Sequence, residues 1–220
     1  MQFNDIKGFA FDLDGVIADT AKFHGQAWHQ TADKVGSPWT AQLADNLKGV
    51  SRMDSLEMIL KAGGHEHEYS LAQKEQLAAA KNENYLQLIK TLTPHDILPG
   101  IAVFLNELKT DGYLMSVASA SKNAPTILKQ LQLTDYFVGT VDPETLTAGK
   151  PDPEIFIKAA EIMHLSPKNV AGLEDSSAGI TAINAAGELS IGIGTGLPAA
   201  QIKFDDTSMV TINNIKKQLK

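Results

Sequence analysis

Acidic side chains occur as two close pairs in this sequence, Asp12 with Asp14 and Glu174 with Asp175, and Lys150 lies between the pairs along the chain. Carboxylates gathered in one place repel one another and stay ionised only when a cation lies among them. Oxygen ligands without His or Cys favour a hard ion, and Mg²⁺ is the common choice where phosphate is the substrate. The residue types therefore indicate magnesium-assisted chemistry on a phosphate, provided that the fold brings the two pairs together.

Each of these groups follows or adjoins a short apolar run that predicts a strand. Helices and strands alternate from residue 101 onward, which implies right-handed crossovers and a parallel sheet covered by helices. Ligands bind beyond the carboxyl ends of the strands of such a sheet. Both acidic pairs, Lys150 and the hydroxyl groups after the second strand are therefore expected on one rim. The predicted strands are residues 7–11, 114–118, 137–141, 169–173 and 190–193.

The segment between the first and second predicted strands has a helical pattern. Ser51 followed by Asp54, and Ser70 followed by Gln73, are typical of capping boxes at helix starts. We therefore expect an α/β fold, a Rossmann-like doubly wound parallel sheet with an inserted α-helical cap domain. The expected domains are an α/β core of residues 1–16 and 93–220, and a helical cap of residues 17–92.

Composition excludes several classes of function. The 220 residues include 19 Lys and Arg against 26 Asp and Glu, a net charge of −7, and no cysteine. Surplus negative charge repels nucleic acid, and the missing cysteine excludes disulfides, thiol nucleophiles and thiolate metal sites. No window approaches the roughly 20 apolar residues of a membrane span. We expect a cytoplasmic protein, a monomer that binds neither nucleic acid nor membranes.

Four motifs resemble those of the haloacid dehalogenase superfamily of phosphotransferases, and the helical insertion lies where that superfamily has its cap. They are Asp12-Leu13-Asp14-Gly15-Val16, Ser119, Lys150-Pro151 and Gly172-Leu173-Glu174-Asp175-Ser176. Within the superfamily the chain is most similar to the β-phosphoglucomutase family, through cap segments as well as core segments. These segments are Trp28, Leu47-Lys48-Gly49-Val50-Ser51-Arg52, Lys81-Asn82-Glu83-Asn84-Tyr85 and Ala118-Ser119-Ala120-Ser121-Lys122-Asn123.

The resemblance implies a role for each group at the rim. Asp12 would be the nucleophile that becomes an aspartyl phosphate, and Asp14 the general acid and base. Lys150 would neutralise charge, and His24 would couple cap closure to Asp14. Ser119 would donate a hydrogen bond to the phosphate. The implied Mg²⁺ ligands are Asp12, the main-chain carbonyl of Asp14, Glu174 and Asp175.

The resemblance also implies that small sugar phosphates are the substrates. A mutase of β-D-glucose 1-phosphate and β-D-glucose 6-phosphate needs glucose 1,6-bisphosphate as a primer and a second phosphate clamp. Backbone amides at a helix N-terminus and the guanidinium of Arg52 suit that clamp. The implied substrate-binding residues are Trp28, Gly49, Val50, Ser51, Arg52, Ser55, Lys81, Ser119, Ala120, Ser121, Lys122 and Asn123.

Alternatives remain open at this point. A phosphatase of small sugar phosphates would share the same rim, and a non-catalytic ligand binder would have no need of Asp14. Taken without the resemblance, Arg52 suits an exposed arginine on a capped helix, Trp28 a core residue and His24 an exposed helix residue. The run His65-Glu66-His67-Glu68 could bind a transition metal, although its polar setting favours a solvated turn.

Overall fold

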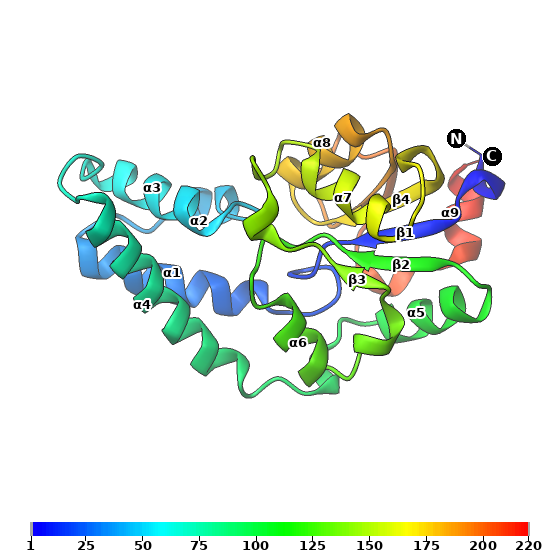
Figure 1. Cartoon of the computed structure of the whole chain (residues 1–220), viewed down its shortest axis with the longest axis horizontal. Coiled ribbons are helices and arrows are strands. Elements are labelled where there is room, and N and C mark those ends of the chain that lie inside the picture. Colours follow the sequence, from blue (N-terminus) through cyan, green and yellow to red (C-terminus); the bar gives the residue numbers. More distant parts are fainter. Residues whose placement is uncertain (1, 220) are drawn as a thin grey trace. The chain divides into compact units, whose positions relative to one another are not determined.

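The computed structural model describes residues 2–219 and divides the chain into two compact units (Figure 1). The helical unit is Thr20–Thr91, and the sheet unit comprises the rest of the described chain. Residues 17–19, which the sequence pattern had placed with the helical segment, belong to the sheet unit. The backbone explains this, because the N–H of Leu98 donates to the carbonyl of Ile17 and Ala18 forms a bridge with Ile97.

The sheet unit contains a six-stranded sheet with the strand order β3-β2-β1-β4-β5-β6. All neighbouring strands in it are parallel. The order reverses between β1 and β4, so ligands are expected at the carboxyl ends of these two strands. The predicted doubly wound parallel sheet is confirmed. The strands are β1 Gly8–Phe11, β2 Leu114–Val117, β3 Gly139–Thr140, β4 Val170–Glu174, β5 Leu189–Ile193 and β6 Ile202–Phe204.

Helices cover both faces of the sheet, with α7 and α8 on one side and α5 and α6 on the other (Figure 1). The first layer packs apolar side chains such as Phe156 and Ile183 against the sheet. On the opposite face, the Phe104 ring lies 5.7 Å from the ring of Phe9, centroid to centroid. Burial on both faces explains why β1 is a continuous apolar run. The helices of this unit are α5 Ile101–Thr110, α6 Ala124–Gln130, α7 Glu154–Ile162, α8 Ser177–Ala186 and α9 Ile212–Gln218.

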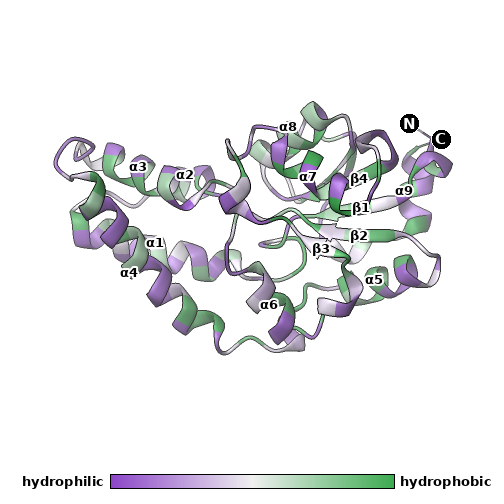
Figure 2. Ribbon diagram, viewed as in Figure 1, coloured by the Kyte–Doolittle hydropathy of each residue, from purple (hydrophilic) through white to green (hydrophobic). Residues whose placement is uncertain are grey.

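The helical unit has its own apolar core, in which α1, α3 and α4 pack on one another. The hydropathy colours alternate along α4, as expected for a helix with one buried face (Figure 2). Both predicted helix starts are present, with Ser51 accepting from the N–H of Asp54 and Ser70 accepting from that of Gln73. The helices are α1 Ala21–Val35, α2 Ala41–Asn46, α3 Arg52–Gly63 and α4 Leu71–Ile89.

Several short elements differ from the sequence-based expectation. The strand expected at 137–141 is confined to Gly139–Thr140, because it pairs only with the end of β2 at the edge of the sheet. The strand β6 and the helices α2 and α9 were not predicted, since three to seven residues give too little periodicity to detect. Among the described residues, no helix is both long and apolar enough to cross a membrane.

Candidate active site

Asp12 occupies the first position after β1, at the point where the strand order reverses. Its backbone N–H donates to the carbonyl of Leu173 at 3.0 Å, so the position of Asp12 is set by the ladder to β4. The chain then turns sharply, because the carbonyl of Leu13 accepts from the N–H of Ile17 at 2.9 Å. Asp12 is 4% exposed, so its carboxyl group is buried at the carboxyl end of β1.

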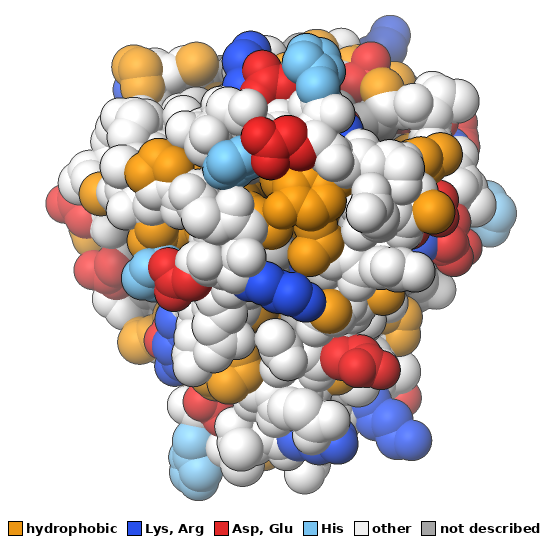
Figure 3. All heavy atoms as spheres, turned by 90° about the vertical axis from the view of Figure 1, so that its left-hand side faces the viewer, with side chains coloured by type: hydrophobic (Ala, Val, Ile, Leu, Met, Phe, Trp, Pro, Cys, Tyr) orange, Lys and Arg blue, Asp and Glu red, His pale blue; other side chains and the backbone are white. Residues whose placement is uncertain are grey.

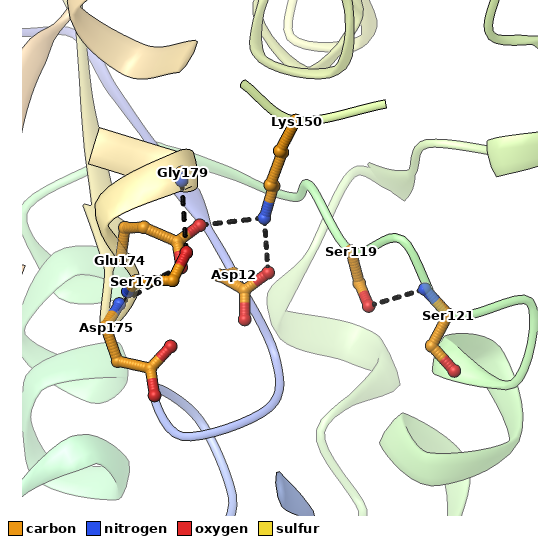
Figure 4. Close-up of polar contacts among 8 residues, drawn as sticks. All are labelled: Asp12, Ser119, Ser121, Lys150, Glu174, Asp175, Ser176 and Gly179. Carbon is orange, nitrogen blue, oxygen red and sulfur yellow. Dashed lines mark hydrogen bonds and ion pairs between the residues drawn. The ribbon is translucent and has the colours of Figure 1, made fainter. Parts of the chain in front are cut away.

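Lys150 joins the two acidic pairs that the sequence keeps far apart (Figure 4). Its Nζ lies 2.5 Å from Oδ1 of Asp12 and 2.7 Å from Oε2 of Glu174. All three side chains are buried, so each charge depends on the others for compensation. Burial alone lowers the pKa of the Lys150 ammonium, but the carboxylates of Asp12 and Glu174 outweigh it and raise that pKa above its ordinary value. Lys150 is therefore a fixed positive charge.

The Glu174 carboxylate is held by the start of α8 as well as by Lys150. Its Oε1 accepts from the backbone N–H of Asp175 at 3.1 Å, and from the N–H and Oγ of Ser176 at 3.1 and 2.9 Å. Ser176 is also the N-cap of α8, because its Oγ accepts from the N–H of Gly179. A Cβ at Gly179 would come within 1.9 Å of Oε2 of Glu174, so only glycine fits there. These contacts hold the Glu174 carboxylate at the start of α8.

The oxygen atoms at this rim suit a hard divalent cation. Carboxylate oxygens of Asp12, Glu174 and Asp175 lie within 4.8 Å of one another, the one such group found in the described part of the chain. Gly15 lets the turn approach them, because its φ is +87° and a Cβ would lie 2.3 Å from Oδ2 of Asp175. Burial, followed by the charge of Glu174, raises the pKa of Asp12 well above its usual value, although Lys150 acts to lower it. A cation would relieve this repulsion, and an all-oxygen donor set fits Mg²⁺.

The loop after β2 folds into a turn at the same edge of the sheet. The N–H of Ala118 donates to the carbonyl of Phe11 at 2.7 Å, so Ser119 follows β2 beside the residue that follows β1. The Oγ of Ser119 accepts from the N–H of Ser121 at 3.1 Å, and the Oγ of Ser121 accepts from the N–H of Asn123 at 3.3 Å. This compact turn leads into α6.

Two flanking residues of that turn differ in exposure. Ser119 is 1% exposed, whereas Lys122 is exposed and forms an ion pair with Glu144. Ala120 lies between the two serines and is half-buried. The turn thus combines a buried hydroxyl near Asp12 with an exposed, ion-paired lysine.

Within the helical unit, Lys81 is the centre of a second polar cluster. Its Nζ lies 2.9 Å from Nδ1 of His24, 4.5 Å from the Trp28 ring centroid and 4.9 Å from that of Tyr85. The rings of His24 and Tyr85 stack at 3.9 Å. Burial, then the charges of Lys81 and Arg52, lower the pKa of His24 well below its usual value, which favours the neutral imidazole. The cluster surrounds the Lys81 side chain, which is only 3% exposed, with ring atoms and a ring nitrogen.

The start of α3 carries the other predicted binding residues of the helical unit. Arg52 donates from its Nη2 to Oδ1 of Asn82 at 2.8 Å, which orients the guanidinium. Gly49 has φ +71°, a left-handed conformation that glycine adopts readily, and Val50 follows it in the turn before α3. Ser55 is buried on the first turn of the helix. The arrangement presents Arg52 beside a helix N-terminus.

The open alternatives have different outcomes in the structure. Trp28 is 4% exposed and packs in the core of the helical unit. It also contacts Lys81, so it is both a core residue and part of the polar cluster. His24 is not an exposed helix residue, because it is half-buried against Tyr85. His65 lies in a turn paired with Glu68 at 3.0 Å, and no metal-binding group forms there among the described residues. That stretch is the expected turn.

Sequence reasoning assigned no role to three positions, although two of them, Tyr85 and Ser176, lie in the segments that carry the family resemblance. Tyr85, Ser176 and Glu154 all fix the side chains or loops of the site, through the contacts with His24, Glu174 and the loop before Lys150. Ser176 could have been found, since a serine before a helix start is a favoured N-cap. The contacts of the other two could not be predicted, because the partner of Tyr85 is distant in the sequence and the partners of Glu154 lie in an irregular loop.

Charged side chains of both signs lie on the face of the molecule that Figure 3 shows. On the face drawn in Figure 3, Lys and Arg side chains lie apart from one another, among acidic, histidine and apolar side chains. That face has no continuous basic stripe of the kind that nucleic acid requires.

Comparisons with known proteins bear on the whole chain. A family model described as haloacid dehalogenase-like hydrolase matches residues 6–187. A β-phosphoglucomutase from Bacillus subtilis is 44% identical over 215 residues, 97% of this chain and 95% of that protein. A crystal structure of a β-phosphoglucomutase from Clostridium difficile matches with a TM-score of 0.94 at 40% identity, covering 97% of each chain. A phosphorylated carbohydrates phosphatase from Thermotoga maritima is 29% identical over 180 residues, 80% of each chain.

These matches extend over the sheet unit and the helical unit alike, and they include the strand-end motifs that form the acidic cluster. The chain belongs to the haloacid dehalogenase-like hydrolase family.

Proposed function

We propose that this protein is a β-phosphoglucomutase, an enzyme that interconverts β-D-glucose 1-phosphate and β-D-glucose 6-phosphate through β-glucose 1,6-bisphosphate. The observation that carries the proposal is the buried Asp12 carboxylate, held 2.5 Å from Lys150 at the carboxyl end of β1. The substrate comes from the relatives, since the 44% identity to the Bacillus subtilis β-phosphoglucomutase covers both units. Small sugar phosphates are the proposed ligands.

Asp12 is the proposed nucleophile. An oxygen of its carboxylate attacks the phosphorus atom, a new O–P bond forms, and the bond between phosphorus and the sugar oxygen breaks. Asp14 gives its proton to the departing sugar oxygen. In the reverse step Asp14 removes a proton from the free hydroxyl of a sugar monophosphate, whose oxygen attacks the phosphoaspartate, so that the bisphosphate forms and Asp12 is regenerated. General acid and base catalysis of this kind raises the reaction rate by roughly 10²–10⁴-fold.

The remaining groups of the sheet unit stabilise charge at the phosphate. Lys150 supplies a permanent positive charge beside the nucleophile, and Ser119 with the amide of Ala120 donates hydrogen bonds to phosphate oxygens. Asp12, the main-chain carbonyl of Asp14, Glu174 and Asp175 would hold Mg²⁺. When bound there, the ion would offset the negative charges of nucleophile and phosphate.

A mutase, unlike a phosphatase, must also bind the phosphate that is not being transferred. We assign this role to Arg52 and the amides at the start of α3, since Asn82 already orients the guanidinium. We assign Lys81 and Trp28 to the sugar, with His24 positioning Lys81 through the contact between its Nδ1 and the Lys81 Nζ at 2.9 Å. Further proposed contacts with the substrate come from Gly49, Val50, Ser51, Ser55, Ser121, Lys122 and Asn123.

One product assay tests the proposal. The enzyme receives β-glucose 1-phosphate, Mg²⁺ and a trace of glucose 1,6-bisphosphate as the primer, and both glucose 6-phosphate and free phosphate are measured. Glucose 6-phosphate as the main product, lost in Asp12→Asn and in Asp14→Asn, is the expected result. Free phosphate as the main product would establish the phosphatase instead, and no product would leave only a ligand-binding protein.

A second comparison separates the mutase from the phosphatase within one preparation. Arg52→Ala should lower the mutase rate far more than the hydrolysis of a simple phosphomonoester, because only the mutase needs the second phosphate held. Asn82→Ala, which leaves the guanidinium in place without its partner, is the matched variant and should show a smaller loss. Equal losses in both reactions would remove the assignment of Arg52.

We further propose that the enzyme is a monomer and that it acts in the cytoplasm, where phosphorylated sugars are metabolised. Light scattering during size-exclusion chromatography would measure the oligomeric state, and a stable dimer would contradict it.

A further inference from the structure

Lys150 stands on an irregular loop, although its ammonium must lie within hydrogen-bond distance of two carboxylates. Residues 147–150, termed the lysine loop, belong to neither a helix nor a strand and lie between a short 3₁₀ turn and α7. Thr147 and Ala148 are exposed to solvent, while Lys150 is buried. No sheet ladder holds this backbone, so some other contact must set the position of Lys150.

Glu154, the first residue of α7, supplies that contact. Its Oε2 accepts from the backbone N–H of Thr147 at 2.7 Å, from the hydroxyl of Thr147 at 2.7 Å and from the N–H of Ala148 at 3.1 Å. Its Oε1 lies 3.0 Å from Nζ of Lys158, one turn farther along α7. One carboxylate therefore gathers two backbone donors and a side-chain donor from the lysine loop.

The charge of Glu154 persists across the working pH range. The hydrogen bond from the Thr147 hydroxyl, then the contact with Lys158, lower the pKa of this carboxyl to about 2. A carboxylate in the first turn of a helix is also favoured by the helix dipole. Glu154 is thus an ionised acceptor at neutral pH.

The helix that carries Glu154 is itself fixed to the sheet. Ile155 and Phe156 are buried in the core, and the hydroxyl of Ser116 on β2 donates to the carbonyl of Ala159 on α7 at 2.9 Å. Lys158 adds a second link, since its Nζ also lies 2.5 Å from the carbonyl of Thr145 just before the lysine loop. A continuous series of contacts runs from the sheet through α7 to the backbone before Lys150.

We propose that Glu154 is a positioning residue, which holds the lysine loop so that the Lys150 ammonium stays between Asp12 and Glu174. The inference rests on the proposed function in assigning Lys150 to phosphoryl transfer. Glu154 touches neither the nucleophile nor, on this view, the substrate, and all its influence on the rate passes through Lys150. A purely structural role would instead change stability without depending on Lys150.

A double-mutant cycle measures that dependence. Glu154→Ala should lower kcat by about 10- to 100-fold, because small displacements of a charge-stabilising group can lose that much. In the background of Lys150→Met, whose own rate is already low, the same substitution should change kcat by less than about twofold, since the group it positions is gone. Multiplicative losses in the two backgrounds would overturn the proposal.

Three further variants keep the test decisive. Glu154→Gln retains an acceptor oxygen for the lysine loop and should recover most of the activity lost in Glu154→Ala. Glu161→Ala removes an exposed glutamate from the same helix and should leave kcat unchanged. Thr147→Val removes one of the three donors of the lysine loop and should lower kcat by less than Glu154→Ala does. This loss should also vanish in the Lys150→Met background. The variant replaces Glu154→Ala in the cycle if Glu154→Ala does not fold.

The result of this double-mutant cycle can be distinguished from a failure of the proposed mutase function. The cycle can be followed through either glucose 6-phosphate or free phosphate, so a phosphatase would refute the mutase assignment and still report the coupling. A loss of activity in Glu161→Ala equal to that in Glu154→Ala would contradict the specific role of Glu154.

Discussion

Glu188 gives the sharpest prediction about stability, because it is a carboxyl group inside the apolar core. It is 2% exposed and lies between the end of α8 and the start of β5. A Cβ at Gly172 on β4 would come within 3.0 Å of Oε2 of Glu188 and 2.8 Å of the Ile183 side chain, which shows how closely the carboxyl packs on the sheet. Among the described residues, no hydrogen bond reaches either of its oxygens.

The perturbation is Glu188→Met, which keeps a similar chain length and removes the polar head. A buried polar group without a partner destabilises the folded state by about 1–3 kcal/mol. The substitution should therefore raise the free energy of unfolding by that amount near neutral pH. For a protein of this size, each kcal/mol corresponds to roughly 2–4 °C in Tm.

The pH dependence of stability follows from the raised pKa of Glu188. Burial raises this pKa well above the ordinary value of 4.5, so the folded protein keeps a proton that the unfolded chain releases. The stabilisation associated with the protonated form is complete below the unfolded pKa and is lost as pH rises through the folded pKa. The steepest loss for one group is about 1.4 kcal/mol per pH unit.

Urea unfolding tests this pH dependence. The free energy of unfolding is measured for the wild type, Glu188→Met and Glu188→Gln at several pH values between about 5 and 9. The stability difference between the wild type and each variant should grow in favour of the variant as pH rises. Glu161→Met, at an exposed position, controls for the loss of a charge. Parallel curves for the wild type and Glu188→Met, or a Glu188→Met protein less stable at pH 8, would refute the reasoning.

Three other predictions concern the site and the helical unit. Gly179→Ala should lower kcat/KM by at least about tenfold, because its Cβ would meet the Glu174 carboxylate and displace the partner of Lys150; wild-type kinetics would show that Glu174 can move freely. Excess EDTA should abolish turnover and added Mg²⁺ should restore it, whereas full activity in chelator would exclude the metal from the reaction. Ser51→Ala should lower stability by about 1 kcal/mol in urea unfolding, since Ser51 caps α3 by accepting from the N–H of Asp54; no change would mean that the cap is redundant.

The sheet could be predicted because its signals are local. Buried parallel strands such as β1 and β4 are short apolar runs, and the polar residues that follow each run mark its carboxyl end. The helical pattern after β1 predicted the insertion, and the family resemblance was confirmed by a relative of 44% identity. The strand β6 and the helices α2 and α9 escaped prediction because they are too short for periodicity to be distinguished from chance.

The candidate site was predictable as a set of positions and not as a set of contacts. Strand-end logic placed Asp12, Lys150 and Glu174 at one rim, and their ion pairs lie there. The same logic could not say that the Glu174 carboxylate already accepts from Ser176 and Asp175. Those hydrogen bonds depend on the exact backbone geometry at the start of α8, which residue types alone do not determine.

The sequence by itself determined which residues are available at the end of each strand, because apolar runs, turn residues and caps act over a few neighbouring positions. Only the tertiary structure decided which charges meet, since Lys150 is 138 residues from Asp12 and their contact depends on sheet order and on a loop anchored by Glu154. It also decided that Glu188 is buried with no hydrogen-bond partner among the residues described. Burial and pairing are properties of surfaces brought together from distant parts of the chain, and no local pattern encodes them.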